Sequence, residues 1–134
     1  MGYCINLTDC EFGILKDNKE KALQAIKELM GKVGELRQGG DFAWVSTGDV
    51  LASCSFEGAM ECWRYPAESD DNGDIAYIQF DGEKLGEEHL MFQAIAPYVV
   101  AGSYLQFQGE DGSIWRWIFD GEKMIDKAAT IFFE

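Results

Sequence analysis

One stretch near the end of the chain decides the fold class: Tyr104–Phe119 reads YLQFQGEDGSIWRWIF. Apolar and polar residues alternate on both sides of Gly109–Ser113, a segment whose glycines and acidic residues are typical of a turn. This pattern predicts a β-hairpin with one buried face. Patterns of the same kind predict one or two strands at residues 3–15 and further strands at residues 42–45, 75–80 and 130–133.

Three helices are predicted between these strands, and the first is the clearest. It begins after a capping residue, Asp17 or Asn18, and its apolar residues recur at steps of three and four up to Val33. Gly34 is a plausible stop signal for this helix.

The other two predicted helices are shorter. The second begins after Ser53 or Ser55 and ends before Pro66, because proline cannot continue a helix. The third covers about residues 87–98, and the acidic residues in its first turn suit the positive end of the helix dipole. Pro97 lies near its end and is expected to kink or shorten it.

The order of these elements predicts an α+β fold for a single domain of residues 1–134. Helices and strands are interleaved, but the predicted hairpin and the last strand follow one another directly. We therefore expect a single antiparallel or mixed sheet of about five to six strands packed with about three helices. A chain of 134 residues with 47% hydrophobic residues can bury a core of its own.

The charge of the chain is strongly acidic and unevenly distributed. It has 24 acidic and 11 basic residues, and residues 67–134 carry 14 of the acidic and 4 of the basic ones. Direct binding to nucleic acid or to an anionic membrane is disfavoured, because both require cationic side chains. The same charge suits a basic protein partner.

Ten acidic residues of the second half form the predicted partner-binding surface. They fall in predicted turns and at the start of the third helix, so we expect them to be exposed. The alternative is a surface that only confers solubility. The ten residues are Glu68, Asp70, Asp71, Asp74, Asp81, Glu83, Glu87, Glu88, Glu110 and Asp111.

Motifs for catalysis, cofactors or metals do not stand out. The cysteines Cys4, Cys10, Cys54 and Cys62 lack the spacing of zinc ligands and are interpreted as free thiols of a reduced, cytoplasmic protein. His89, the only histidine, is expected to be exposed or half-buried, with no nucleophile beside it. We therefore expect no enzyme, no catalytic residue, no metal and no cofactor.

Two further patterns bear on the core. Trp115 and Trp117 share one face of a predicted strand and are interpreted as core residues, while Arg116 faces the other way as a partner for nearby acids. Residues 72–85 and 111–124 share a turn, a strand and a second turn at Asp-Gly. We interpret this similarity as two related strand modules in one sheet.

The second half of the chain resembles a group of small, uncharacterised acidic proteins of bacteria and their phages. The resemblance covers Leu85-Gly86, the segments 92–98, 102–104 and 109–112, and Trp115–Phe119. It implies the cargo of a mobile element, a class that includes anti-CRISPR and anti-restriction inhibitors. No functional residue is carried over from it.

Three functions remain open at this stage. The leading hypothesis is a non-enzymatic acidic protein that masks a basic, nucleic-acid-handling surface of a defence enzyme, with affinity from a small aromatic centre. The second is an immunity protein or antitoxin that neutralises a basic toxin. The third is a small ligand-binding domain or enzyme with a pocket between sheet and helices.

Overall fold

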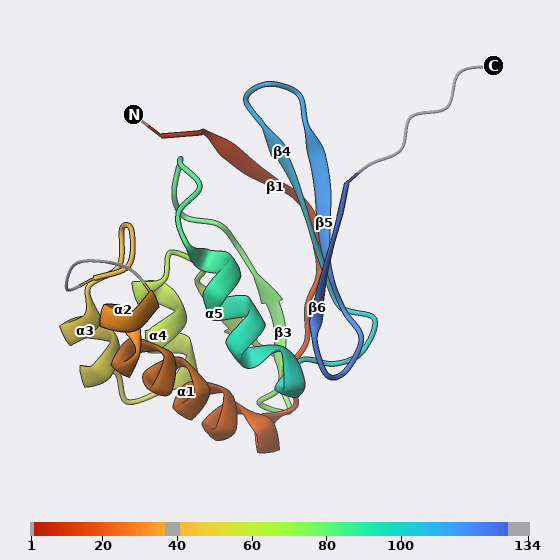
Figure 1. The fold of residues 1–134 in the computed structure, drawn as a ribbon. Coiled ribbons are helices and arrows are strands. Elements are labelled where there is room, and N and C mark those ends of the chain that lie inside the picture. The colour runs from red at the N-terminus through yellow and green to blue at the C-terminus, as the bar shows by residue number, and fades with distance from the viewer. Residues whose placement is uncertain (1, 37–40, 129–134) are drawn as a thin grey trace.

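The computed structural model describes residues 2–36 and 41–128. The α+β fold is confirmed: helices cover one face of a four-stranded antiparallel sheet (Figure 1). The strand order of this sheet is β1-β4-β5-β6, and β2 and β3 form a separate hairpin. The strands are β1 (Ile5–Glu11), β2 (Ala67–Ser69), β3 (Ile75–Ile78), β4 (Tyr104–Gly109), β5 (Ile114–Phe119) and β6 (Met124–Ala128).

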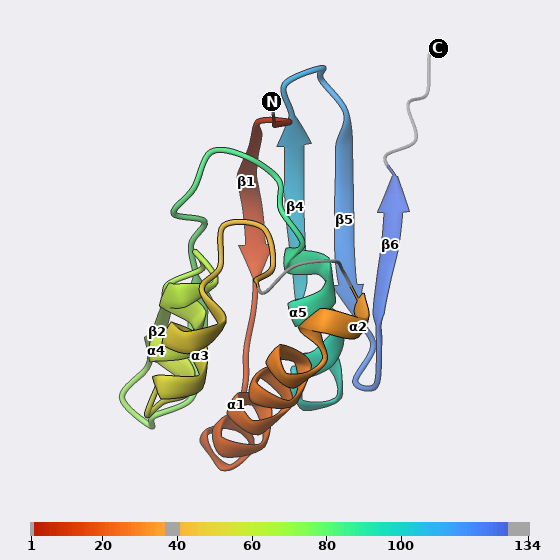
Figure 2. The ribbon, with the colours of Figure 1, turned by 60° about the vertical axis from the view of Figure 1, so that its left-hand side comes forward.

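The helices all lie on the same side of the four-stranded sheet (Figure 1). Figure 2 shows α5 in front of β4 and β5, with α1 packed against α5 below. Within the described part of the chain, no helix covers the opposite face of this sheet. The helices are α1 (Lys16–Gly31), α2 (Val33–Leu36), α3 (Thr47–Ala52), α4 (Phe56–Cys62) and α5 (Glu88–Ile95), followed by the 3-10 turn η1 (Ala96–Tyr98).

The predicted hairpin of β4 and β5 is confirmed. Leu105 pairs with Trp117, and Phe107 pairs with Trp115, so these side chains share the face that α5 covers. The turn requires a glycine at Gly112, whose φ is +87°, in the left-handed region. The alternation seen in the sequence therefore corresponds to one buried face and one open face.

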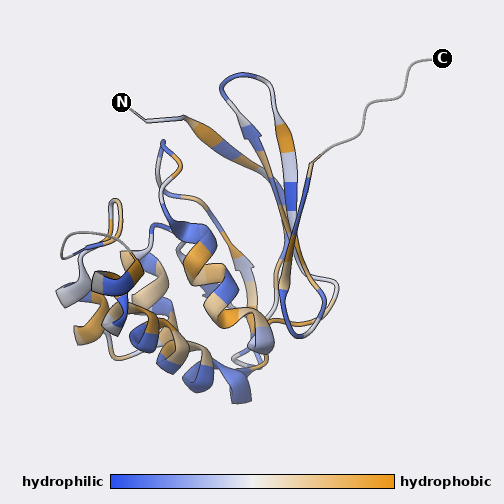
Figure 3. Ribbon diagram, viewed as in Figure 1, coloured by the Kyte–Doolittle hydropathy of each residue, from blue (hydrophilic) through white to orange (hydrophobic). Residues whose placement is uncertain are grey.

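The core is aromatic where α5 meets the sheet. The ring of Phe92 lies 6.0 Å from that of Phe12, 5.8 Å from that of Trp117 and 6.3 Å from that of Phe119. All four side chains are buried. Both α1 and α5 carry hydrophobic and hydrophilic residues on different sides (Figure 3), so each buries one stripe against this core.

The first helix forms where it was predicted, but its cap is supplied from elsewhere. Leu15 occupies the N-cap position and makes no side-chain cap bond. Instead, an Oδ1 of Asp74 accepts a hydrogen bond from the backbone N–H of Lys16 at 2.7 Å. The prediction that Asp17 or Asn18 caps the helix was wrong, because both lie inside its first turn.

The segment between α1 and β2 differs from the prediction at its start. Residues 42–45 form a turn rather than the predicted strand, and Trp44 adopts a φ of 68°. The short helix α3 was not predicted. The next helix, α4, begins after Ser55 as predicted, with Ser55 Oγ accepting from the N–H of Gly58 at 3.0 Å. Helix α4 ends at Cys62, four residues before Pro66, and the backbone of Arg64 between them has a φ of 73°.

The six strands are divided between two sheets instead of sharing the single sheet that we expected. The chain after β1 meets the β2–β3 hairpin at an isolated bridge between Ile14 and Ile75. The two strand modules noted in the sequence are β3 and β5, which lie in different sheets, so that interpretation was wrong. Strand β6 was not predicted, and the strand predicted at residues 130–133 lies outside the described residues.

Candidate functional site

The ten acidic residues of the predicted partner-binding surface lie in different environments. Asp74 and Glu87 are half-buried, and Glu88 is buried. The remaining residues are exposed, as expected: Glu68, Asp70, Asp71, Asp81, Glu83, Glu110 and Asp111.

Five of the seven exposed acidic residues gather in two separate places, and Asp81 and Glu83 lie in the segment that follows β3. Residues 68–74 belong to the β2–β3 hairpin, which meets the chain at Ile14, beside the start of α1. Glu110 and Asp111 belong to the β4–β5 turn, where Glu110 accepts a hydrogen bond from the N–H of Cys4 at 3.0 Å. The chain from Cys4 to Ile14 is mostly extended, and at roughly 3.3 Å per residue it separates the two groups by roughly 30 Å.

The acids of the β2–β3 turn serve the fold directly. Asp70 Oδ1 accepts from the N–H groups of Asn72 at 2.9 Å and Asp74 at 3.1 Å, and thereby holds the turn. Asp74 in turn accepts from the N–H of Lys16 at the start of α1. Reversing these two charges would disturb the fold as well as any binding surface.

Glu88 corrects the expectation that all ten acids are exposed, because it is only 1% exposed. It lies one turn before Phe92 on the buried stripe of α5. Its carboxylate accepts from Tyr65 Oη at 2.7 Å, from the N–H of Gly86 at 2.6 Å and from Arg64 Nη2 at 3.3 Å. Three donors thus compensate for the desolvation of this charge.

Arg64 completes this buried cluster and ties together three parts of the chain. Its guanidinium lies 5.2 Å from the ring centre of Phe80 and 5.9 Å from that of Trp44, and Nη1 donates to the carbonyl of Lys84 at 2.9 Å. The positive φ values of Trp44 and Arg64 therefore occur beside each other. This arrangement assigns Arg64 to the structure of the fold.

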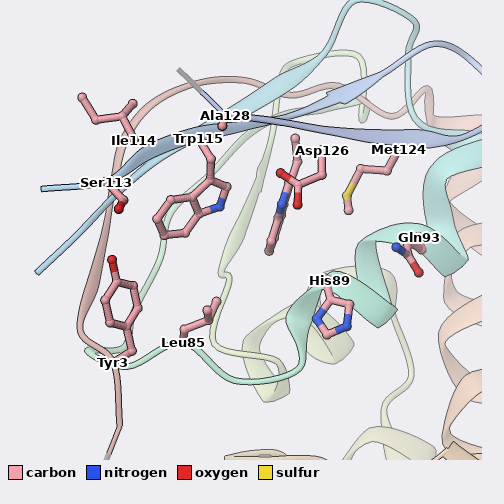
Figure 4. Close-up of a pocket in the computed structure, with 11 residues that line it drawn as sticks. Tyr3, Leu85, His89, Gln93, Ser113, Ile114, Trp115, Met124, Asp126 and Ala128 are labelled. Atoms are coloured by element: carbon pink, nitrogen blue, oxygen red, sulfur yellow. The ribbon is translucent and has the colours of Figure 1, made fainter. Parts of the chain in front are cut away.

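A groove of about 500 Å³, here called the aromatic groove, opens between the sheet and the start of α5 (Figure 4). Residues of β5 and β6 line one side, and His89 and Gln93 of α5 lie opposite them. Tyr3 and Leu85 lie at one end. The lining residues are Tyr3, Leu85, His89, Gln93, Ser113, Ile114, Trp115, Trp117, Met124, Asp126 and Ala128.

Aromatic rings form one side of the groove. Trp115 stacks on Phe107, with 5.6 Å between ring centres and 20° between ring planes, and lies 6.4 Å from Tyr3. Trp117 is 4% exposed, so it belongs to the core as predicted. Trp115 is only half-buried and presents its ring to the groove, because α5 does not extend far enough to cover it.

Polar groups reach the same space from several elements. Asp126 of β6 is exposed and points toward α5, which contributes the exposed side chains of His89 and Gln93 (Figure 4). Ser113 adds a hydroxyl near Tyr3. The groove therefore combines a flat aromatic wall with a carboxylate, an imidazole and an amide.

A hydrogen bond holds the end of the groove in place. Tyr3 Oη donates to Asp111 Oδ1, and this bond lowers the pKa of Asp111 and raises the pKa of Tyr3. Asp111 therefore keeps its negative charge to a lower pH than an ordinary aspartate. With Asp126 in the lining and Glu110 beside Cys4, it places negative charge around an aromatic surface.

The open face of the sheet has a different character. Arg116, predicted to be a partner for nearby acids, donates from Nε to Gln106 Oε1 at 2.8 Å, and its guanidinium lies 4.4 Å from the ring centre of Tyr104. Tyr104 Oη donates to Asp9 at 2.9 Å. Arg116 also pairs across the strands with Lys127, so this face carries two adjacent cations.

The described residues contain no group of three or more His, Cys, Asp or Glu that could hold a metal ion. The four cysteines are free thiols, and Cys54 is the exposed one. Across residues 2–36 and 41–128, no helix is both long and apolar enough to span a membrane.

A comparison with protein-family models, with curated proteins and with solved structures found no match to this chain. The functional argument therefore depends on the geometry of the groove and on the charges around it.

The groove was not predicted from the sequence, although His89, Trp115 and Trp117 of its lining had been considered there. Tyr3, His89, Trp115 and Asp126 come from four separate parts of the chain. No local spacing links them. A tryptophan near the start of a hairpin strand, next to an acidic turn, is a local signal that could have pointed here.

Proposed function

We propose that this chain is a non-enzymatic acidic binding protein that covers a basic surface of a protein partner. The observation that carries the proposal is the aromatic groove, which has Asp126 in its lining and Asp111 bonded to its terminal Tyr3. The groove provides the small aromatic centre that the sequence predicted as the source of affinity for the partner.

The chemistry of the groove suits lysine and arginine side chains. Their aliphatic stems pack on an aromatic ring such as that of Trp115, and their charged ends reach a carboxylate such as that of Asp126. The net charge of −13 speeds the encounter with a basic partner through long-range attraction. Aromatic contacts at the centre then slow dissociation.

The partner class that we propose is a nucleic-acid-handling defence enzyme, whose basic surface this chain would mask as an anti-CRISPR or anti-restriction type inhibitor. This class is the one expected from the sequence, and the negative charge around the aromatic groove supports it. An immunity protein or antitoxin against a basic toxin uses the same physics with another partner. We propose that the protein acts in the cytoplasm, where its four thiols stay reduced.

The experiment compares two variants of equal charge in affinity capture from a bacterial lysate. Asp126→Lys changes the groove, whereas Asp71→Lys changes the distant β2–β3 hairpin; both residues are exposed. We expect the native protein and the hairpin variant to capture the same basic protein, and the groove variant to lose it. High salt should weaken capture.

Equal capture by both variants would contradict the proposal, as would recovery of abundant ribosomal proteins alone. A second candidate function, small-ligand binding, is favoured by the convergence of His89, Gln93 and Asp126 on one groove. A ligand that stabilises the protein against heat, and loses this effect in His89→Ala/Gln93→Ala, would support that function instead.

A further inference from the structure

We propose that the partner binds as an extended basic segment that adds a strand to the free edge of β6 and places alternate side chains in the aromatic groove. This inference rests on the proposed function and adds the mode of binding and the sequence pattern of the segment. Two features of the sheet carry it: an edge that has no neighbouring strand among residues 2–36 and 41–128, and a groove lined by residues of that edge strand.

The edge of the sheet at β6 is open. Among the described residues, β6 pairs with β5 alone and is the last strand of the sheet. Alternate residues of such a strand direct their N–H and C=O groups away from the sheet. These groups can form hydrogen bonds with the backbone of an extended chain. In β-strand addition, such backbone hydrogen bonds provide affinity that does not depend on the side chains.

The opposite edge of the sheet, at β1, is bridged to other segments at both of its ends. Ile5 of β1 donates its N–H to the carbonyl of Glu83 at 2.9 Å, and Cys4 forms a bridge with Lys84. Ile14, beyond the other end of β1, forms a bridge with Ile75. The segment is therefore expected at β6 and not at β1.

The residues of β6 alternate between the groove and the open face. Met124, Asp126 and Ala128 line the groove, and Asp126 pairs with the buried Trp117. Lys127 pairs with Arg116 on the open face. An added strand shares this alternation, because its side chains also point to the two faces in turn.

The charges then define a pattern for the segment. Its groove-side residues meet Asp126 and the ring of Trp115, which favour lysine or arginine. Its other residues meet Lys127 and Arg116, which disfavour a cation at those positions. The expected segment therefore alternates basic residues with uncharged β-formers or acids.

The same carboxylate argues against a second copy of this chain as the occupant. An inward-pointing charge on an edge strand opposes pairing with a like strand, and Asp126 has this position. The net charge of −13 adds repulsion between two copies. A basic segment neutralises Asp126, whereas a second copy adds further negative charge.

The test uses a synthetic peptide of alternating lysine and threonine, about eight residues long, with blocked ends. Two derivatives carry N-methyl groups, one on the lysine amides and the other on the threonine amides, so that each blocks one edge of the peptide strand. Affinity is measured by titration calorimetry against the full chain, and the mass of the complex by light scattering.

We expect the parent peptide to bind, and one methylated derivative to bind roughly 10- to 100-fold more weakly, because the few backbone hydrogen bonds of one edge are lost. The other derivative should bind within about threefold of the parent, since its free edge still faces β6. Asp126→Asn should weaken binding of the parent, whereas Glu122→Gln, which removes a charge in the exposed β5–β6 turn, should not.

Equal affinity of both derivatives would overturn strand addition. It would not contradict the proposed function, because the groove would then bind the peptide through its side chains alone. Failure of all three peptides to bind would count against both. A doubling of the protein mass without peptide would show β6 occupied by a second copy and would also overturn the inference.

Discussion

Replacing Glu88 by glutamine should destabilise the fold strongly, although the side chain keeps its shape. Glu88 is 1% exposed, and its carboxylate accepts hydrogen bonds from Tyr65, Gly86 and Arg64. Glutamine has one acceptor oxygen and an amide that only donates. At least one of these donors would therefore lose its acceptor, and the Arg64 guanidinium would lose its counter-charge.

The expected loss follows from these contacts. A buried donor without an acceptor costs about 1–3 kcal/mol. Breaking a buried ion pair by removing one partner costs about 3–5 kcal/mol. The Arg64 side chain retains 16% exposure, so solvent screens part of its charge. We therefore expect a decrease of about 3 kcal/mol in the free energy of unfolding, a large part of the roughly 5–15 kcal/mol of a typical domain.

Urea unfolding followed by tryptophan fluorescence measures this loss. With a slope of about 2 kcal/mol per molar, the midpoint should fall by about 1.5 M. Glu68→Gln is the matched control, because Glu68 is exposed on β2 and its change should stay within about 0.5 kcal/mol.

A double-mutant cycle with Arg64→Met tests whether the effect comes from the pair. Arg64→Met/Glu88→Gln should cost at least about 1 kcal/mol less than the sum of the two single changes, because the residues interact directly. A midpoint for Glu88→Gln equal to that of the native protein, or strictly additive losses in the cycle, would refute the reasoning.

Three further predictions follow from other contacts. Burial and the Glu88 carboxylate raise the pKa of Tyr65 well above its ordinary value. The unfolded tyrosine releases its proton near pH 10 while the folded one keeps it, so the free energy of unfolding should fall as the pH rises above about 10. Urea titrations at several pH values should show this fall, and a smaller one in Tyr65→Phe. Asp74→Ala removes the acceptor for the N–H of Lys16 and should cost about 1 kcal/mol, with a loss of helical circular dichroism on heating at a lower temperature. Gly112→Ala places a side chain at a φ of +87° and should cost about 1 kcal/mol in thermal unfolding, whereas Gly48→Ala, inside α3, should stabilise or leave the midpoint unchanged.

Elements with strong local signals could be predicted from the sequence. The β4–β5 hairpin follows from alternation around Gly109–Ser113, and α1 from its apolar stripe. Ser55 was a correct cap for α4 because its partner, the N–H of Gly58, is three residues away. In each case, the interacting groups are close along the chain.

Features that depend on distant residues could not be predicted. The cap of α1 comes from Asp74, which is 58 positions from Lys16. Glu88 resembles any acidic residue at the start of a helix until the fold brings Arg64 and Tyr65 against it. The residues of β6, Met-Ile-Asp-Lys-Ala, do not alternate between apolar and polar, so no strand pattern marks them.

The sequence by itself determined the α+β class, the main hairpin and a net charge of −13. Tertiary structure alone decided how that charge is used. It gathers five of the seven exposed candidate acids in two places, buries Glu88, and leaves Trp115 half-buried because α5 does not extend over it. The physical reason is the distance along the chain over which each effect acts. Propensity and periodicity depend on residues a few positions apart, whereas a groove forms between elements that are distant in the sequence.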